Sequence, residues 1–159
     1  MKLKFLVEED VINYKKTSMF IGFPHCTLKC GADCQNKHLL KELTICYNID
    51  GIVLRYINNP LTSAIVMGGL EPFDDWEDLK NLIESFRTVT KDDIVIYTGY
   101  YEEEIDKEYL EWIKEQSSKG TIIIKFGRYV PNTEKIFNED LGVTLSSNNQ
   151  YIKKYESNN

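Results

Sequence analysis

Short, continuous apolar runs alternate with stretches of helical periodicity along most of the chain. The apolar runs have the length and the β-branched content typical of buried strands, and they cover residues 19–23, 64–67, 94–97 and 121–126. Between them, apolar residues recur at helical spacing in residues 49–57, 76–86 and 105–113. Because strands and helices alternate, the pattern predicts an α/β fold with a parallel sheet and crossover helices.

Weaker signals come from the segments on either side of the first run. Residues 2–7 alternate well enough for a first strand. Residues 35–43 predict a short helix, and the β-leaning residues 44–47 follow it. Cys46 lies in this β-leaning segment, and we expect it to be a small buried hydrophobe rather than a metal ligand.

The length and the charge of the chain limit what it can be. A chain of 159 residues can bury about 70% of its extended surface in one core, so we expect one domain over residues 1–159, with a disordered tail at 154–159. A formal net charge of -6 and scattered lysines argue against nucleic acid as a partner. No apolar stretch approaches the roughly 18 residues that a membrane span needs. We therefore expect a soluble, cytoplasmic protein without a membrane partner.

Three of the four cysteines, Cys26, Cys30 and Cys34, lie within nine residues. Disulfides are disfavoured in a reducing compartment, so this cluster indicates metal binding or redox chemistry. An unbroken helix would separate Cys26 and Cys34 by about 12 Å along its axis. Pro24 and Gly31 favour instead a loop that can point all three sulfurs inward.

The residues alone leave two interpretations of this cysteine cluster. In the first, three thiolates hold a metal or a 4Fe-4S cube and leave one coordination position open for a reactive ligand. In the second, the three cysteines and either His25 or His38 hold a structural zinc ion. The second is disfavoured, because structural zinc sites tend to use Cys-x2-Cys pairs and a chain of this length needs no zinc to fold.

Two of the predicted strands end in glycine-containing segments. Gly68-Gly69-Leu70-Glu71-Pro72 follows the run at 64–67, and Thr98-Gly99-Tyr100 follows the run at 94–97. The carboxyl ends of parallel strands meet at one edge of a sheet, where α/β proteins bind ligands, and the cysteine loop follows a strand of the same sheet. Each glycine segment alone is typical of an ordinary turn, but beside the cysteine loop it favours ligand binding.

Four segments in order resemble the small radical S-adenosylmethionine enzymes that activate anaerobic ribonucleotide reductase. These segments are Cys26-x3-Cys30-x3-Cys34-Gln35-Asn36, Gly68-Gly69-Leu70-Glu71-Pro72, Ile96-Tyr97-Thr98-Gly99-Tyr100 and Ser147-Asn148-Asn149-Gln150. The resemblance runs from about residue 20 to residue 150. One departure is that the family's usual Cys-x3-Cys-x2-Cys spacing would put the third ligand at Asp33. We favour Cys34 as that ligand, because thiolate suits iron–sulfur iron better than carboxylate does.

The resemblance implies a partial (β/α) barrel of radical SAM type, with two cofactors. Cys26, Cys30 and Cys34 would hold a 4Fe-4S cluster whose fourth iron is chelated by S-adenosylmethionine. One electron would cleave that cofactor to a 5'-deoxyadenosyl radical. The residues implied in cofactor binding are Gly68, Gly69, Glu71, Tyr97, Thr98 and Gly99. No side chain is assigned a catalytic role beyond the two cofactors.

The resemblance also implies the partners. The radical would take a hydrogen atom from a backbone glycine in the large subunit of the anaerobic ribonucleotide reductase. The chain has no cysteines for a second cluster, so the electron would come from a flavodoxin or a ferredoxin. A different glycyl radical enzyme, or a small molecule, is the alternative target within the same chemistry.

Overall fold

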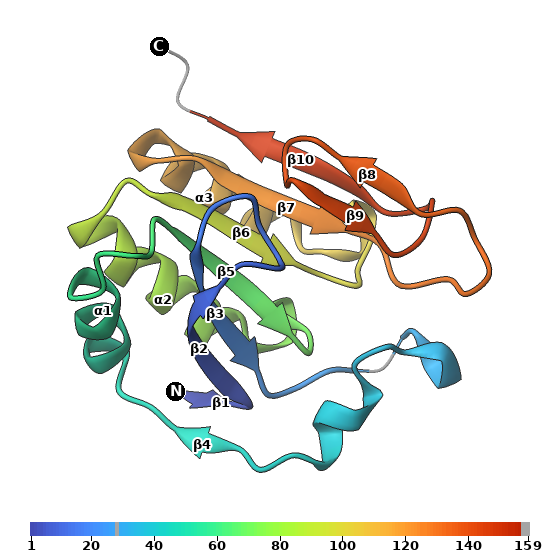
Figure 1. Ribbon diagram of the computed structural model, residues 1–159, viewed down its shortest axis with the longest axis horizontal. Helices are drawn as coiled ribbons and strands as arrows, with labels where there is room; N and C mark the ends of the chain where they lie inside the picture. Colours follow the sequence, from blue (N-terminus) through green and yellow to red (C-terminus); the bar gives the residue numbers. More distant parts are fainter. Residues whose placement is uncertain (28, 157–159) are drawn as a thin grey trace.

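A computed structural model describes residues 1–27 and 29–156. Its centre is a six-stranded sheet with the strand order β10-β7-β6-β5-β3-β2 (Figure 1), and two smaller sheets pair β1 with β4 and β8 with β9. The strands are β1 (Lys2–Leu3), β2 (Phe5–Asp10), β3 (Ser18–Phe23), β4 (Ile45–Cys46), β5 (Ala64–Gly69), β6 (Asp93–Tyr97), β7 (Ile122–Phe126), β8 (Ile136–Asn138), β9 (Val143–Leu145) and β10 (Tyr151–Tyr155). The α-helices are α1 (Ile49–Ile57), α2 (Trp76–Val89) and α3 (Lys107–Gln116).

The four central strands, β3, β5, β6 and β7, run parallel, and α1, α2 and α3 connect them. This confirms the predicted α/β class. The edges differ, because β2 pairs antiparallel with β3 and β10 pairs antiparallel with β7. Residues 11–17 join β2 to β3 and are too few for the crossover that a parallel pair requires. The predicted parallel sheet with crossover helices is therefore confirmed for the four central strands but not for the two edge strands, and the radical SAM type of barrel stays a prediction.

The larger core lies where the three helices cover one face of the sheet (Figure 1). Side chains alternate along each strand, so that Ile65 and Met67 pack in this core while Val66 packs on the opposite side. Burial on both faces explains why the parallel strands are continuous apolar runs. The apolar stripe predicted for α2 is fully buried at Leu79, Leu82, Ile83 and Phe86.

The opposite face of the sheet is only partly covered by protein. Tyr14, in the β2–β3 loop, packs there with Leu141 and Leu145 in a smaller core that also contains Ala64, Val66, Val95 and Ile123. Closer to the carboxyl ends of the strands, the side chains of this face line a cavity instead. Those side chains are Phe20, Tyr97 and Lys125.

Several local predictions need correction. Cys46 is exposed rather than buried, because β4 pairs only with the short β1 and lies outside the central sheet. The predicted helix at 35–43 is a 3-10 helix over Lys37–Lys41. Lys154 and Tyr155, which were assigned to a disordered tail, complete β10, and residues 157–159 of that tail lie outside the described residues.

Among residues 1–27 and 29–156, no helix has the length and apolar character that crossing a bilayer would require.

Candidate metal centre

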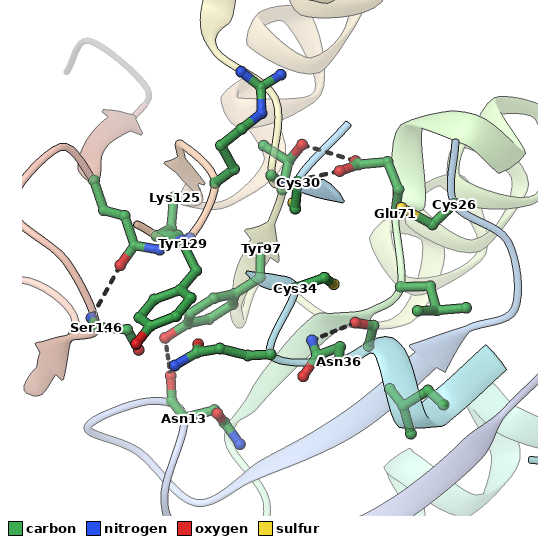
Figure 2. A pocket seen from close by; sticks show the side chains of 18 of the residues that line it. Asn13, Cys26, Cys30, Cys34, Asn36, Glu71, Tyr97, Lys125, Tyr129 and Ser146 are labelled. Atoms are coloured by element: carbon green, nitrogen blue, oxygen red, sulfur yellow. Dashed lines mark hydrogen bonds between the residues drawn. The ribbon is translucent and has the colours of Figure 1, made fainter. Parts of the chain in front are cut away.

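The three clustered cysteines line a single cavity at the carboxyl ends of the parallel strands. The cavity has a volume of about 570 Å³, and Figure 2 shows Cys26, Cys30 and Cys34 around the same space. Five of the six residues expected to bind a cofactor line it too: Gly69, Glu71, Tyr97, Thr98 and Gly99. The fold therefore gathers three separate parts of the sequence at one place, while their binding roles stay predictions.

The cysteine segment is a loop, as expected, and not a helix. It leaves β3 after Phe23, and Gly31 takes a left-handed φ of 66° at the start of a single 3-10 turn over Gly31–Asp33. This turn brings Cys30 and Cys34 close enough for their thiols to influence one another. Burial, followed by the neighbouring Cys34, raises the pKa of the Cys30 thiol, and the charge of Arg128 opposes that rise.

The two candidates for the third ligand differ in where they lie. Cys34 is half-buried and lines the cavity, whereas Asp33 is exposed and does not line it. None of the four cysteines forms a disulfide. This placement favours Cys34 over Asp33 as the third ligand.

The first half of the cysteine loop is held by two consecutive carboxylates that precede α2. Asp74 Oδ2 accepts a hydrogen bond from the backbone N–H of Thr27 at 2.7 Å, and Asp74 Oδ1 accepts one from the Tyr100 hydroxyl. The Asp75 carboxylate lies 2.5 Å from His25 Nδ1. Cys26 thus sits between two anchored neighbours, and the sequence reasoning missed this clamp because its partners are more than forty residues apart.

The second half of the loop is held by one side chain. Asn36 Nδ2 donates to the Gly69 carbonyl at 2.6 Å (Figure 2). Asn36 follows Cys34 by two residues, so this bond ties the third cysteine to the end of β5. Both ends of the loop are therefore fixed to the same segment, residues 69–74.

Glu71 joins the ends of β5 and β6. Its buried carboxylate accepts hydrogen bonds from Thr98 Oγ1 at 2.7 Å, from the Gly99 N–H at 2.9 Å and from the Phe73 N–H at 3.2 Å. Burial raises the pKa of Glu71 to about 7, although all three donors act in the opposite direction. Glu71 therefore holds the ends of β5 and β6 together.

Gly68 and Gly69, at the end of β5, are packed against different neighbours. Gly69 has a φ of 85°, and an added Cβ would lie 2.9 Å from the Gly22 Cα, so close packing against β3 requires glycine there. Gly68 does not line the cavity, and its Cβ would lie 3.2 Å from both the Phe20 ring and the Tyr97 Cβ. A larger residue at position 69 would therefore disturb the packing of β5 against β3.

The Tyr97 side chain forms one wall of the cavity and reaches from β6 to the β2–β3 loop. Its ring lies on the cavity face of β6, and its hydroxyl donates to the Asn13 carbonyl at 2.6 Å (Figure 2). Burial raises the pKa of Tyr97 above its ordinary range. The hydroxyl is therefore a structural donor that fastens the β2–β3 loop over the cavity.

Two basic residues of the cavity were missed by sequence reasoning. Lys125, on β7, is buried, and the signal was a charged residue in an otherwise apolar run. Arg128 lines the cavity with its guanidinium already paired, because its Nη2 lies 2.7 Å from each Glu104 carboxylate oxygen. Lys125 has no such ion pair among the described residues.

The segment 147–150, one of the four resembling segments, closes the cavity beside β7. Gln150 Oε1 accepts from the backbone N–H groups of Ser146 and Ser147, and Gln150 Nε2 donates to the Gly127 carbonyl at 3.2 Å. Gln150 of this segment lines the cavity, as does the preceding Ser146. This segment is therefore part of the site and not a loose polar terminus.

The donor set fits an iron–sulfur cube better than a single ion. Within the described residues, no three His, Cys, Asp or Glu side chains are placed to share one metal ion. A structural zinc ion needs four ligands that converge on it, whereas each thiolate of a 4Fe-4S cube binds a different iron. Cys26, Cys30 and Cys34 around one cavity would supply three thiolates to such a cube.

Comparison with known proteins agrees with this conclusion. The sequence model of a family described as "4Fe-4S single cluster domain" matches residues 15–152. The chain belongs to this family, and a 4Fe-4S cluster with iron–sulfur redox or radical chemistry follows from that membership. No curated protein and no solved structure matches the chain.

Proposed function

We propose that this protein cleaves S-adenosylmethionine reductively and places a radical on a glycine of an anaerobic ribonucleotide reductase. The observation that carries the proposal is one cavity lined both by three cysteines and by the strand-end segments of β5 and β6. Family membership supports the cluster, and the four resembling segments support the radical chemistry. A volume of about 570 Å³ lies within the range of roughly 300–1,000 Å³ typical of small-molecule sites.

When bound, the cluster supplies one electron that breaks a carbon–sulfur bond of S-adenosylmethionine and yields methionine and a 5'-deoxyadenosyl radical. The chain's own residues position and enclose this chemistry. Asp74 and Asn36 hold the cysteine loop, and Glu71 fixes the strand ends against which the cofactor would bind. The rings of Phe20 and Tyr97 give the cavity an apolar wall, which would limit the access of water to a reactive intermediate.

The proposed partners follow from the same arrangement. The fourth cysteine, Cys46, is exposed and does not line the cavity, so the described residues offer no ligands for a second cluster that could relay electrons. A cytoplasmic flavodoxin or ferredoxin would then reduce the cluster. The target would be a backbone glycine of the reductase large subunit, brought to the cavity by a segment of that partner.

A second candidate keeps the chemistry and changes the target. Another glycyl radical enzyme or a small molecule would use the same cavity, since none of the side chains assigned above recognises a particular partner. A structural zinc module is the less favoured candidate, because the described residues do not gather three ligands for one ion.

The test begins with anaerobic reconstitution using iron and sulfide. We expect about four irons per chain, as one 4Fe-4S cube requires, and release of 5'-deoxyadenosine and methionine from S-adenosylmethionine after reduction. Incubation with the anaerobic ribonucleotide reductase of the same genome should then give a glycyl radical doublet in electron paramagnetic resonance. A reductase whose radical glycine is replaced by alanine is the control and should give no doublet.

The possible outcomes separate the candidates. One tightly bound zinc ion and no iron would contradict the whole proposal. Cleavage of S-adenosylmethionine without a radical on the reductase would leave the radical chemistry in place and show that the reductase is not the target.

A further inference from the structure

Lys125 is a buried cation that the proposed function has not used. It lies in β7, two strands from β5 in the central sheet, and its side chain lines the cavity on the face it shares with Tyr97. Only 8% of the residue is exposed. It is the one lysine among the described residues that is buried to this extent.

The protein satisfies the Lys125 ammonium only in part. Of its three N–H donors, one reaches the Gly127 carbonyl at 2.9 Å. That carbonyl also accepts from Gln150 Nε2 at 3.2 Å, so both of its lone pairs are used. No carboxylate forms an ion pair with Lys125 within the described residues, and its nearest ring, that of Tyr97, lies 5.9 Å away.

A buried ammonium without a counter-charge is unfavourable, because the charge has lost its water. Burial lowers the pKa of Lys125 to about 8, which still leaves most of the side chain charged at neutral pH. The charge of the nearby Glu71 favours the charged form of Lys125, but the carboxylate oxygens of Glu71 already accept hydrogen bonds from Thr98, Gly99 and Phe73. The remaining donors of Lys125 are thus available to an anion inside the cavity.

The other cation of the cavity already has a counter-charge. Arg128 Nη2 donates to both Glu104 carboxylate oxygens at 2.7 Å and the guanidinium lies over the Tyr101 ring at 4.9 Å, although its buried Nε has no hydrogen-bond partner among the described residues. Of these two cations, Lys125 is therefore the one without a carboxylate partner. S-adenosylmethionine carries one carboxylate, at its amino-acid end, so this group is the anion of the proposed cofactor that Lys125 could bind.

We propose that Lys125 binds the carboxylate of the amino-acid end of S-adenosylmethionine and thereby selects ligands that carry it. This inference rests on the proposed function, since it concerns the cofactor of the same cavity. A carboxylate has two oxygens, so one can accept from Lys125 while the other reaches a metal.

The experiment compares two ligands and two proteins by binding, without turnover. Cluster-loaded wild type and Lys125→Met are titrated anaerobically with S-adenosylmethionine and with its decarboxylated analogue. Methionine keeps the volume of the side chain and removes the charge, and replacement of a buried charge by an apolar side chain is usually tolerated. Iron content and the unfolding midpoint establish that the variant is loaded and folded.

The substitution should weaken S-adenosylmethionine binding by about tenfold to a hundredfold, the value of a charge-assisted hydrogen bond, and change analogue binding by less than about threefold. Lys114→Met, on the exposed side of α3, should alter neither affinity. Arg128→Met tests the rival cation. If Arg128→Met, and not Lys125→Met, loses the preference for S-adenosylmethionine over its decarboxylated analogue, the assignment to Lys125 is overturned.

Two further results would also overturn it, and they differ in meaning. Equal weakening of both ligands in Lys125→Met would show that the lysine only shapes the cavity, with the proposed function intact. Absence of binding of either ligand to the cluster-loaded wild type would overturn the proposed function and the Lys125 assignment together.

Discussion

Replacing Lys125 with methionine should stabilise the folded protein at neutral pH, even though it removes a hydrogen bond. Burial lowers the pKa of Lys125 from its ordinary 10.5 to about 8, a difference that corresponds to about 3 kcal/mol. Loss of the bond to the Gly127 carbonyl offsets about 1 kcal/mol of this. We therefore expect Lys125→Met to raise the free energy of unfolding by about 2 kcal/mol at pH 7.

The pH dependence gives the sharper test. Between pH 8 and pH 10.5, the folded protein binds fewer protons at Lys125 than the unfolded chain does. The free energy of unfolding of the wild type therefore gains a contribution that rises with pH across this window, and Lys125→Met lacks it. The excess of the unfolding free energy of Lys125→Met over that of the wild type should be largest below pH 8 and should disappear by about pH 10.5.

The assay is urea unfolding of the cluster-free protein at pH 7, 8, 9 and 10, followed by tryptophan fluorescence. The measured quantity is the difference in unfolding free energy between the variant and the wild type at each pH. Lys114→Met, at an exposed position of α3, controls for loss of a lysine as such. A Lys125→Met difference that stays constant from pH 7 to pH 10 would refute the reasoning, because desolvation of the ammonium would then not be the cause.

Three further predictions concern the site and the strand ends. Cys34→Ala should abolish iron binding in anaerobic reconstitution, whereas Asp33→Ala should retain it; the reverse pattern would assign the third ligand to the aspartate. Asp74→Asn should speed iron removal by a chelator by about fivefold to thirtyfold, because one of its two anchoring hydrogen bonds is lost, and an unchanged rate would contradict the clamp. Gly69→Ala should lower the unfolding free energy by more than about 1 kcal/mol, whereas Gly51→Ala, inside α1 with no atom closer than 3.9 Å to the added carbon, should raise it by about 0.5–1 kcal/mol, as urea unfolding would show.

The sequence was sufficient to predict the parallel centre of the sheet and the position of the cysteine loop. Strands buried on both faces leave continuous apolar runs, and helices packed on one side leave a stripe at helical spacing, so both are visible in a single chain. Gly31 and Pro24 showed that the three cysteines lie in a loop. The glycine segments at the ends of β5 and β6 then located the edge of the sheet at which the cavity lies.

The tertiary structure alone decided the edges of the sheet and the supports of the site. β10 pairs with β7, and its pattern contains charged residues because one of its edges has no partner strand, so local periodicity did not reveal it. Asp74 and Asn36 act on atoms 33 to 47 residues away, and no local pattern records such a pairing. A lysine inside the apolar run at 122–126 was visible in the sequence, but only the fold showed that it is buried and lines the same cavity as the cysteines, and the free-energy cost of an ammonium depends on those surroundings.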